Sequence, residues 1–140
     1  MQSIIQKRFE EHLEVANSVM QSEILVQVER VAVTIKTALA NGKKVLFCGN
    51  GGSAADSQHL AAEFVGRFQK ERQGLPAIAL TVDTSILTAV SNDYGFDKVF
   101  VRQVEALGNE GDVFVGISTS GTSLTYLLPL NWQRLKGCTV

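Results

Sequence analysis

Apolar residues recur at helical spacing through the N-terminal part of the chain. One series covers residues 4–20, with glutamates on the opposite face, and a second series covers residues 24–39. The second series stops at Asn41–Gly42, a pair typical of a helix C-cap. The two series are interrupted at Gln21–Ser22, where the serine is a good N-cap residue. The pattern therefore predicts two N-terminal helices within residues 1–41.

The remainder of the chain alternates between short apolar runs and helical patterns. The apolar runs are typical of buried strands, and they cover residues 44–48, 77–82 and 112–117. The helical patterns between them cover residues 54–65, 84–91 and 97–107. This alternation predicts a parallel sheet with right-handed crossovers. We therefore expect an α/β fold, a three-layer sandwich with a central parallel sheet and flavodoxin-like winding, preceded by N-terminal helices.

Local signals predict where some of these elements begin and end. We expect Ser53 to cap the helix that follows it, and a Thr or Ser cap to start the helix at Thr84. Asn92–Gly95 has the composition of a turn. In the helix after it, the spacing predicts that Phe100, Val104 and Leu107 point inward.

The length is that of a single domain over residues 1–140, in which residues 43–140 would form the α/β core. Residues 137–140 have the pattern of a fourth strand, and an apolar strand without a covering element leaves an exposed edge. We therefore expect the domain to be incomplete at its C-terminal end, or to be covered by a partner. The first helix also has nothing local to pack on, so we expect it to cover the domain or to pair with another subunit.

The charge balance argues against several classes of function. The 13 basic and 14 acidic residues give a net charge of −1, which disfavours binding of nucleic acid or a membrane surface through bulk charge. No apolar run approaches the ~18 residues of a membrane span. Glutamates near the N-terminus argue against a signal or transit peptide. Cys48 and Cys138 lie in apolar runs without metal-type spacing, which predicts buried reduced thiols in a cytoplasmic protein.

Two segments rich in glycine and hydroxyl residues follow predicted strands, at Gly49–Ser53 and Ser118–Ser123. Open α/β sheets bind ligands at the carboxyl ends of their strands. There, glycines let a ligand approach the backbone, while free amides and hydroxyls hydrogen-bond an anion. Neither segment matches a Walker loop or a dinucleotide-binding loop. Asp83 lies near the end of the second predicted strand, so a contact of its carboxylate with a nucleotide ribose stays an alternative. A small phosphorylated compound is therefore the favoured ligand.

His59 and Glu63 are four residues apart in the helical pattern after the first segment, so their side chains share one helix face. A histidine and a carboxylate at this spacing can be two zinc ligands or an acid/base pair. A solvated surface pair is the simpler interpretation of such a pair taken alone. The residues by themselves leave these alternatives open.

Several blocks of the sequence together resemble the sugar isomerase (SIS) domain of the phosphoheptose isomerase family. In chain order they are Gly49–Arg67, Leu75–Leu80, Asn92–Phe96, Arg102–Gly108 and Gly111–Gly121. The resemblance implies an aldose–ketose isomerase that converts sedoheptulose 7-phosphate to D-glycero-D-manno-heptose 7-phosphate. This reaction begins the synthesis of ADP-heptose for the lipopolysaccharide core.

The resemblance also implies roles for individual residues. Glu63 matches the family's catalytic glutamate, and His59 with Glu63 matches two of its zinc ligands. The residues that would hold the phosphate are Ser53, Ser118, Thr119, Ser120 and Ser123. The residues that would line the sugar are Asn50, Gly51, Gly52, Asn92 and Asp93. The single zinc ion of each site would take its remaining ligands from a C-terminal helix beyond this sequence, and the segment around Pro129 departs from the family's helical pattern.

Members of this family are cytoplasmic homotetramers, so the resemblance implies a homo-oligomer that acts on a phosphorylated seven-carbon sugar, with no nucleic acid or membrane partner. The alternative is a non-catalytic SIS protein that binds a phosphosugar or associates with a replication initiator. Position 63 discriminates between the two, because the initiator-associating proteins lack the glutamate that stands here as Glu63.

Overall fold

The computed structural model describes residues 2–121 and residue 125. The chain divides into two compact units, residues 1–34 and residues 35–140. The first unit holds helix α1 (Gln2–Met20) and most of helix α2 (Ile24–Ala40). The predicted break between these helices is confirmed.

Ser22 forms that break through its side chain. Its Oγ donates a hydrogen bond to the carbonyl of Val19 at 2.8 Å and accepts one from the amide of Ile24 at 3.2 Å. The hydroxyl thus satisfies a carbonyl at the end of α1 and an amide at the start of α2. These are the backbone groups that have no partner within a helix.

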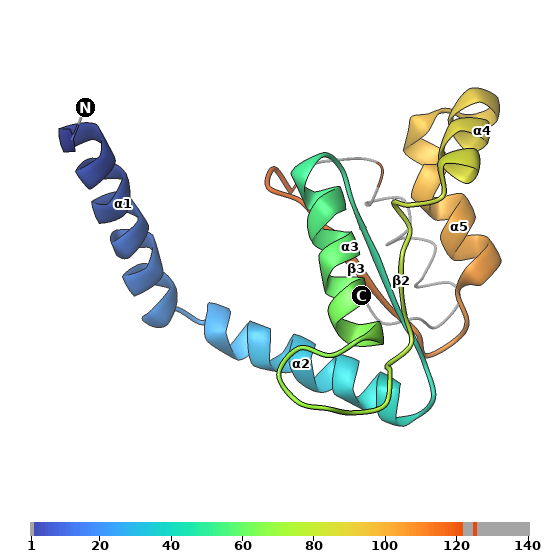
Figure 1. Cartoon of the computed structure of the whole chain (residues 1–140), viewed down its shortest axis with the longest axis horizontal. Coiled ribbons are helices and arrows are strands. Elements are labelled where there is room, and N and C mark those ends of the chain that lie inside the picture. Colours follow the sequence, from blue (N-terminus) through green and yellow to red (C-terminus); the bar gives the residue numbers. More distant parts are fainter. Residues whose placement is uncertain (1, 122–124, 126–140) are drawn as a thin grey trace. The chain divides into compact units, whose positions relative to one another are not determined.

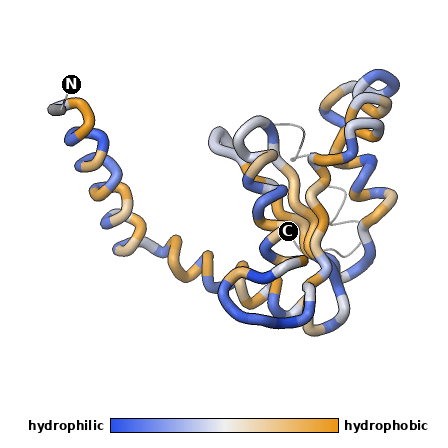
Figure 2. Tube along the Cα trace, viewed as in Figure 1, coloured by the Kyte–Doolittle hydropathy of each residue, from blue (hydrophilic) through white to orange (hydrophobic). Residues whose placement is uncertain are grey.

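Most of the large apolar side chains of α1 and α2 are exposed, and Figure 2 shows apolar positions recurring along both helices. Between 43% and 70% of the surface is exposed in Ile4, Ile5, Phe9, Leu13, Val15, Met20, Ile24, Leu25, Val26, Val28, Val31 and Val33. Within residues 2–121, no helix combines the length and the apolarity that a membrane crossing requires. Apolar helix faces of this kind are available to a partner.

The second unit is built on three parallel strands, β1 (Val45–Gly49), β2 (Ala77–Ala79) and β3 (Val113–Ile117). Their order is β2-β1-β3, and Gly49 at the end of β1 is in register with Ile117 at the end of β3. The remaining elements are α3 (Gly52–Val65), α4 (Thr84–Tyr94), the short 3-10 helix η1 (Phe96–Lys98) and α5 (Val99–Leu107).

Alternate residues of the central strand β1 face opposite layers. Leu46 and Cys48 pack in a cluster with Phe100 of α5, against which α4 also packs. Phe47 packs on the other face, where its ring lies 5.6 Å from the ring of Phe64 in α3. Figure 1 shows α3 and α5 on either side of the strands. The predicted three-layer α/β fold is confirmed, and both faces of the sheet are buried, as parallel sheets require.

Two helix starts differ from the sequence prediction. α3 begins after Gly51, whose φ of 57° forms the strand-to-helix turn. Ser53 lies buried in the first helical turn, so its predicted role as the cap is wrong. α4 is capped by Asp83, whose carboxylate accepts a hydrogen bond from the amide of Ile86 at 2.9 Å. The predicted Thr or Ser cap is therefore wrong, because the residue before the hydroxyls has the extended backbone that a cap needs.

Three other element ends also differ. β2 stops at Ala79, although the apolar run continues to residue 82. α4 continues through Asn92–Tyr94, so the predicted turn there is wrong; the helix ends at Gly95, where φ is 90°. A glycine with positive φ ends a helix more strongly than Asn or Asp does. Leu107 is 40% exposed because it is the last residue of α5, so its predicted inward position is wrong.

Cys48 is a buried free thiol in the sheet. It is 0% exposed, and desolvation by burial raises the pKa of its thiol to about 12. A thiol that stays protonated at neutral pH is a poor nucleophile. The predicted buried reduced thiol is confirmed for Cys48, whereas Cys138, Pro129 and the predicted fourth strand lie outside the described residues.

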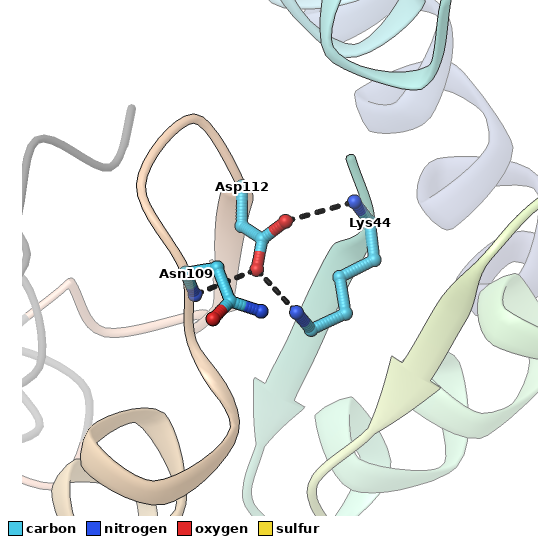
Figure 3. Close-up of polar contacts among 3 residues, drawn as sticks. All are labelled: Lys44, Asn109 and Asp112. Atoms are coloured by element: carbon cyan, nitrogen blue, oxygen red, sulfur yellow. Dashed lines mark hydrogen bonds and ion pairs between the residues drawn. The ribbon is translucent and has the colours of Figure 1, made fainter. Parts of the chain in front are cut away.

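A buried carboxylate joins the amino-terminal ends of β1 and β3 (Figure 3). Asp112 accepts hydrogen bonds from the backbone amides of Lys44 and Asn109, at 3.0 and 2.8 Å, and pairs with the Lys44 ammonium. Burial alone raises the pKa of the Asp112 carboxyl, but the hydrogen bonds and charge of Lys44, with the Asn109 amide, lower it below its ordinary value. Ionised Asp112 therefore stabilises the fold.

We expect Asp112→Asn to lower the free energy of unfolding at neutral pH by about 1–3 kcal/mol, because the amide cannot replace the carboxylate in all three interactions. The folded pKa lies below the unfolded value of about 3.9. The carboxylate thus stabilises the fold above the unfolded pKa, and this contribution is lost as the pH falls through the folded pKa. Urea denaturation at pH 7 and at several acid pH values should show the gap between the two proteins narrowing with acidification.

Glu110→Gln is the matched control for this experiment, since Glu110 is exposed in the same loop. We expect it to leave the free energy of unfolding within about 0.5 kcal/mol of wild type at every pH. A gap between wild type and Asp112→Asn that stays constant through the acid range would contradict the assignment.

Candidate functional site

Two loops leave neighbouring strands at one edge of the sheet. Residues 50 and 51 follow β1, and residues 118–121 follow β3. Since Gly49 is in register with Ile117, both loops begin at the carboxyl edge of the parallel sheet. This edge is where open α/β sheets bind ligands. The structure therefore places both glycine- and hydroxyl-rich segments where a shared ligand can meet them.

The first loop combines one close contact with two open positions. A Cβ on Gly49 would lie 2.5 Å from the carbonyl oxygen of Ser53, so α3 begins directly against the end of β1. At Gly51 and Gly52 a Cβ would meet no heavy atom within 4 Å. A ligand can therefore approach the backbone at these two glycines, near the positive end of the α3 dipole.

Hydroxyl groups gather in the second loop. Ser118 Oγ accepts a hydrogen bond from the amide of Gly121 at 3.1 Å and lies 3.4 Å from Ser120 Oγ. Thr119 and Ser120 are exposed. Hydroxyl groups this close together can donate to the oxygens of one anion. Ser123, the remaining serine in the predicted phosphate set, lies outside the described residues.

A hydrogen bond joins the first loop to the chain beyond the second. The Asn50 side-chain amide donates to Thr125 Oγ1 at 2.8 Å, and Thr125 is 7% exposed. Thr125 was not predicted as a site residue, because a single threonine in a segment without a clear pattern gives no sequence signal for such a contact. The contact links Asn50 at the carboxyl edge to the segment that follows the second loop.

His59 and Glu63 lie on one face of α3, as the spacing predicts. The distance from His59 Nε2 to Glu63 Oε1 is 4.0 Å, and their side chains are 71% and 30% exposed. Both line a groove of about 310 Å³ whose other walls are mainly apolar, formed by Leu60, Phe64, Phe68, Arg72 and Leu75. A carboxylate at the rim of an apolar groove can act as a base toward a bound compound.

The same two side chains fit two ligand positions around one zinc ion. Ligand atoms about 2.0–2.2 Å from zinc lie roughly 3.4 Å apart in a tetrahedral site, and at most roughly 4.3 Å apart. The 4.0 Å separation is close enough to be adjusted by small side-chain rotations. Among the described residues, no group of three or more His, Cys, Asp or Glu side chains could hold a metal. The described part of the chain thus offers two ligands and no complete site.

Asn92 and Asp93 lie in a different layer from the His59–Glu63 pair. Both are exposed near the end of α4, and the Asn92 amide donates to the Asp93 carboxylate at 2.9 Å. α4 packs with α5 on the face of the sheet opposite α3. The sugar contacts predicted for these two residues therefore stay a prediction.

Two arginines follow α3 and behave differently. Arg67 is 65% exposed and pairs with Glu71 at 3.4 Å. Arg72 is half-buried and donates hydrogen bonds to the carbonyls of Glu63 and Phe64, at 2.8 and 2.9 Å. These contacts of Arg72 were not predicted, because hydrogen bonds to main-chain carbonyls leave no signal in the residue pattern of a polar connection.

Comparisons with known proteins identify the family of this chain. The family model described as the SIS domain matches residues 8–139. The chain therefore belongs to the SIS domain family. Two solved structures resemble it: a phosphoheptose isomerase from Neisseria gonorrhoeae, with 43% identity and a TM-score of 0.88 over 98% of this chain and 71% of that one, and another from Francisella tularensis, with 39% identity and a TM-score of 0.74 over 91% and 72%.

Curated relatives point to the same group within the family. The phosphoheptose isomerase of Geotalea uraniireducens is 61% identical over 119 residues, which are 85% of this chain and 62% of the relative. That of Aliarcobacter butzleri is 53% identical over 140 residues, which are 99% of this chain and 72% of the relative. The chain spans between 50% and 72% of the length of such relatives. The resemblance to phosphoheptose isomerases found in the sequence is confirmed.

Proposed function

We propose that the chain acts as an aldose–ketose isomerase, converting sedoheptulose 7-phosphate to D-glycero-D-manno-heptose 7-phosphate. In this proposal the reaction is the first step of ADP-heptose synthesis for the lipopolysaccharide core. The observation that carries it is the position of Glu63, partly exposed at the rim of an apolar groove and 4.0 Å from His59. The names of the similar curated proteins and solved structures support the same reaction.

Binding of the substrate would use residues of the two loops together with two residues of α4. The phosphate would bind to the hydroxyl groups of Ser53, Ser118, Thr119, Ser120 and Ser123. The sugar would contact Asn50, Gly51, Gly52, Asn92 and Asp93. Open backbone at Gly51 and Gly52 and the close hydroxyls of Ser118 and Ser120 support the phosphate end of this assignment.

Glu63 is the proposed base of the isomerisation. Its carboxylate would remove a proton from the carbon next to the substrate carbonyl, and the carbonyl oxygen would take up a proton to give an enediol. Return of the first proton to the former carbonyl carbon, with loss of the proton from the other hydroxyl oxygen, would give the aldose. Zinc, held by His59 and Glu63 and by further ligands from a C-terminal helix beyond this sequence, would supply electrophilic stabilisation of the carbonyl oxygen when bound. The apolar walls of the groove would exclude water from the reacting carbons.

A homo-oligomer, and specifically a tetramer, belongs to the same proposal. It is supported by the apolar side chains that α1 and α2 expose. We also propose a cytoplasmic location, with a phosphorylated seven-carbon sugar as the ligand and no nucleic acid or membrane partner. The net charge of −1 supports the absence of a nucleic acid partner.

Turnover of sedoheptulose 7-phosphate by this chain, measured with and without added zinc, tests the proposal. We expect the aldose product to form. A folded chain that binds the sugar phosphate but produces no aldose under either condition would contradict the proposal, and would favour a non-catalytic SIS protein that binds phosphosugars or a replication initiator.

A further inference from the structure

Arg72 lies in the connection between α3 and β2, where this connection passes the end of α3. The connection is hydrophilic (Figure 2). Arg72 Nη2 donates to the Glu63 carbonyl at 2.8 Å, and its Nη1 donates to the Phe64 carbonyl at 2.9 Å. The same Nη1 is 3.4 Å from the Gly66 carbonyl and 3.0 Å from that of Gln73. One guanidinium group therefore binds two main-chain carbonyls in the last turn of α3 and two in the connection that follows it.

The carbonyls of Glu63 and Phe64 are ones that α3 itself cannot satisfy. The last four carbonyls of a helix have no amide partner within it and need one from outside. At the end of α3 the Gly66 amide still bonds to the Ala62 carbonyl, at 2.8 Å, but the carbonyls of Glu63 and Phe64 lie beyond that point. The last turn of α3 contains no basic residue, so Arg72 supplies the positive charge that stabilises a helix C-terminus.

Glu63 belongs to this last turn. A helix end without caps frays, and a side chain on a frayed turn has no fixed position. The planar fork of arginine can hold two carbonyls at once, which the single ammonium of lysine cannot do with the same geometry. Arg72 also lines the groove that His59 and Glu63 line. The residue that fixes the backbone of Glu63 is thus also a wall of the candidate site.

We propose that Arg72 is a positioning residue for Glu63: it holds the last turn of α3 in helical geometry and so fixes the carboxylate at the rim of the groove. The effect on catalysis rests on the isomerase function proposed above, whereas the effect on the helix end does not. Arg72 itself touches main-chain carbonyls, so its action on the reaction passes through Glu63.

Hydrogen exchange tests the effect on the helix end. The variants are Arg72→Lys and Arg72→Ala, with Lys70→Gln as the control that removes an exposed positive charge from the same connection. In the Arg72 variants we expect the amides of Gly66 and Leu75, which bond to the carbonyls of Ala62 and Phe64, to exchange roughly ten- to a hundredfold faster. Amides of β1 should keep their wild-type rates, and Lys70→Gln should match wild type throughout.

Kinetics tests the effect on Glu63. We expect Arg72→Lys to lower kcat for sedoheptulose 7-phosphate roughly ten- to a hundredfold, with KM changed less than about threefold, because the phosphate loops lie at the other end of α3. Lys70→Gln should retain the wild-type values. A wild-type chain without turnover would overturn the proposed reaction, while the exchange rates would still decide whether Arg72 fixes the helix end.

Three results would overturn the role of Arg72. One is unchanged exchange at Gly66 and Leu75 in both variants. Another is faster exchange in β1 to the same extent, since that indicates general destabilisation. The third is an increase in KM with unchanged kcat, because a residue that positions a base acts on the chemical step. If Arg72→Ala does not fold, Arg72→Lys retains the positive charge and carries the test alone.

Discussion

Replacing Glu63 with glutamine should reduce turnover of sedoheptulose 7-phosphate by about a hundred- to ten-thousandfold, the range expected when a general base is removed. Glutamine has nearly the shape of glutamate, but its amide cannot take up a proton at neutral pH. Glu63 is 30% exposed on α3, and glutamine fills nearly the same volume there, so the fold should be kept. The initial rate of aldose formation at saturating substrate measures the effect.

Glu71→Gln is the matched control, because it makes the same chemical change at a side chain that is 83% exposed and paired with Arg67. We expect its turnover to stay within about twofold of wild type. The temperature of unfolding should be measured for both variants, so that a loss of rate is not confused with a loss of fold. Wild-type turnover in Glu63→Gln would remove the glutamate from the mechanism.

Replacing Gly49 with alanine should produce the largest loss of stability. The new Cβ would lie 2.5 Å from the Ser53 carbonyl oxygen and 2.7 Å from its carbonyl carbon, both of which are backbone atoms that no rotamer can move. Overpacking in a rigid core costs about 1–3 kcal/mol, and we expect the upper end because the start of α3 itself must shift. Urea denaturation monitored by circular dichroism measures the change.

Gly52→Ala provides the comparison within the same loop. At Gly52 a Cβ would meet no heavy atom within 4 Å, and the residue is the first of α3. Alanine in a helix is favoured over glycine by up to about 1 kcal/mol, so this variant should be neutral or slightly stabilised. Equal losses in both variants would show that the close contact at Gly49 does not determine the packing of α3 on β1.

The apolar pattern predicted the layers of the fold because each strand is covered on both faces. The run of residues 45–48 is continuously apolar since Leu46 and Cys48 face one layer and Val45 and Phe47 the other. The positions of the two loops also followed from the pattern, since parallel strands align their carboxyl ends. Sheet geometry alone therefore predicts that Asn50 and Ser118 lie near one edge.

The pattern failed where backbone conformation or contacts distant in sequence decide the outcome. Ser53 has the composition of a cap, but Gly51 adopts a φ of 57° and starts the helix earlier. Asn92 and Asp93 favour turns, yet α4 includes them and ends at Gly95. The role of Arg72 depends on how the connection folds back onto the end of α3. Such contacts leave no periodicity that a sequence pattern could reveal.

The buried thiol of Cys48 gives the protein an internal reporter of sheet opening. Because its pKa of about 12 and its complete burial keep it from reacting in the folded state, an alkylating reagent at neutral pH can modify it only after β1 separates from its neighbours. In a chain whose Cys138 is replaced by serine, the alkylation rate at position 48 therefore measures how often the central strand becomes accessible to reagent.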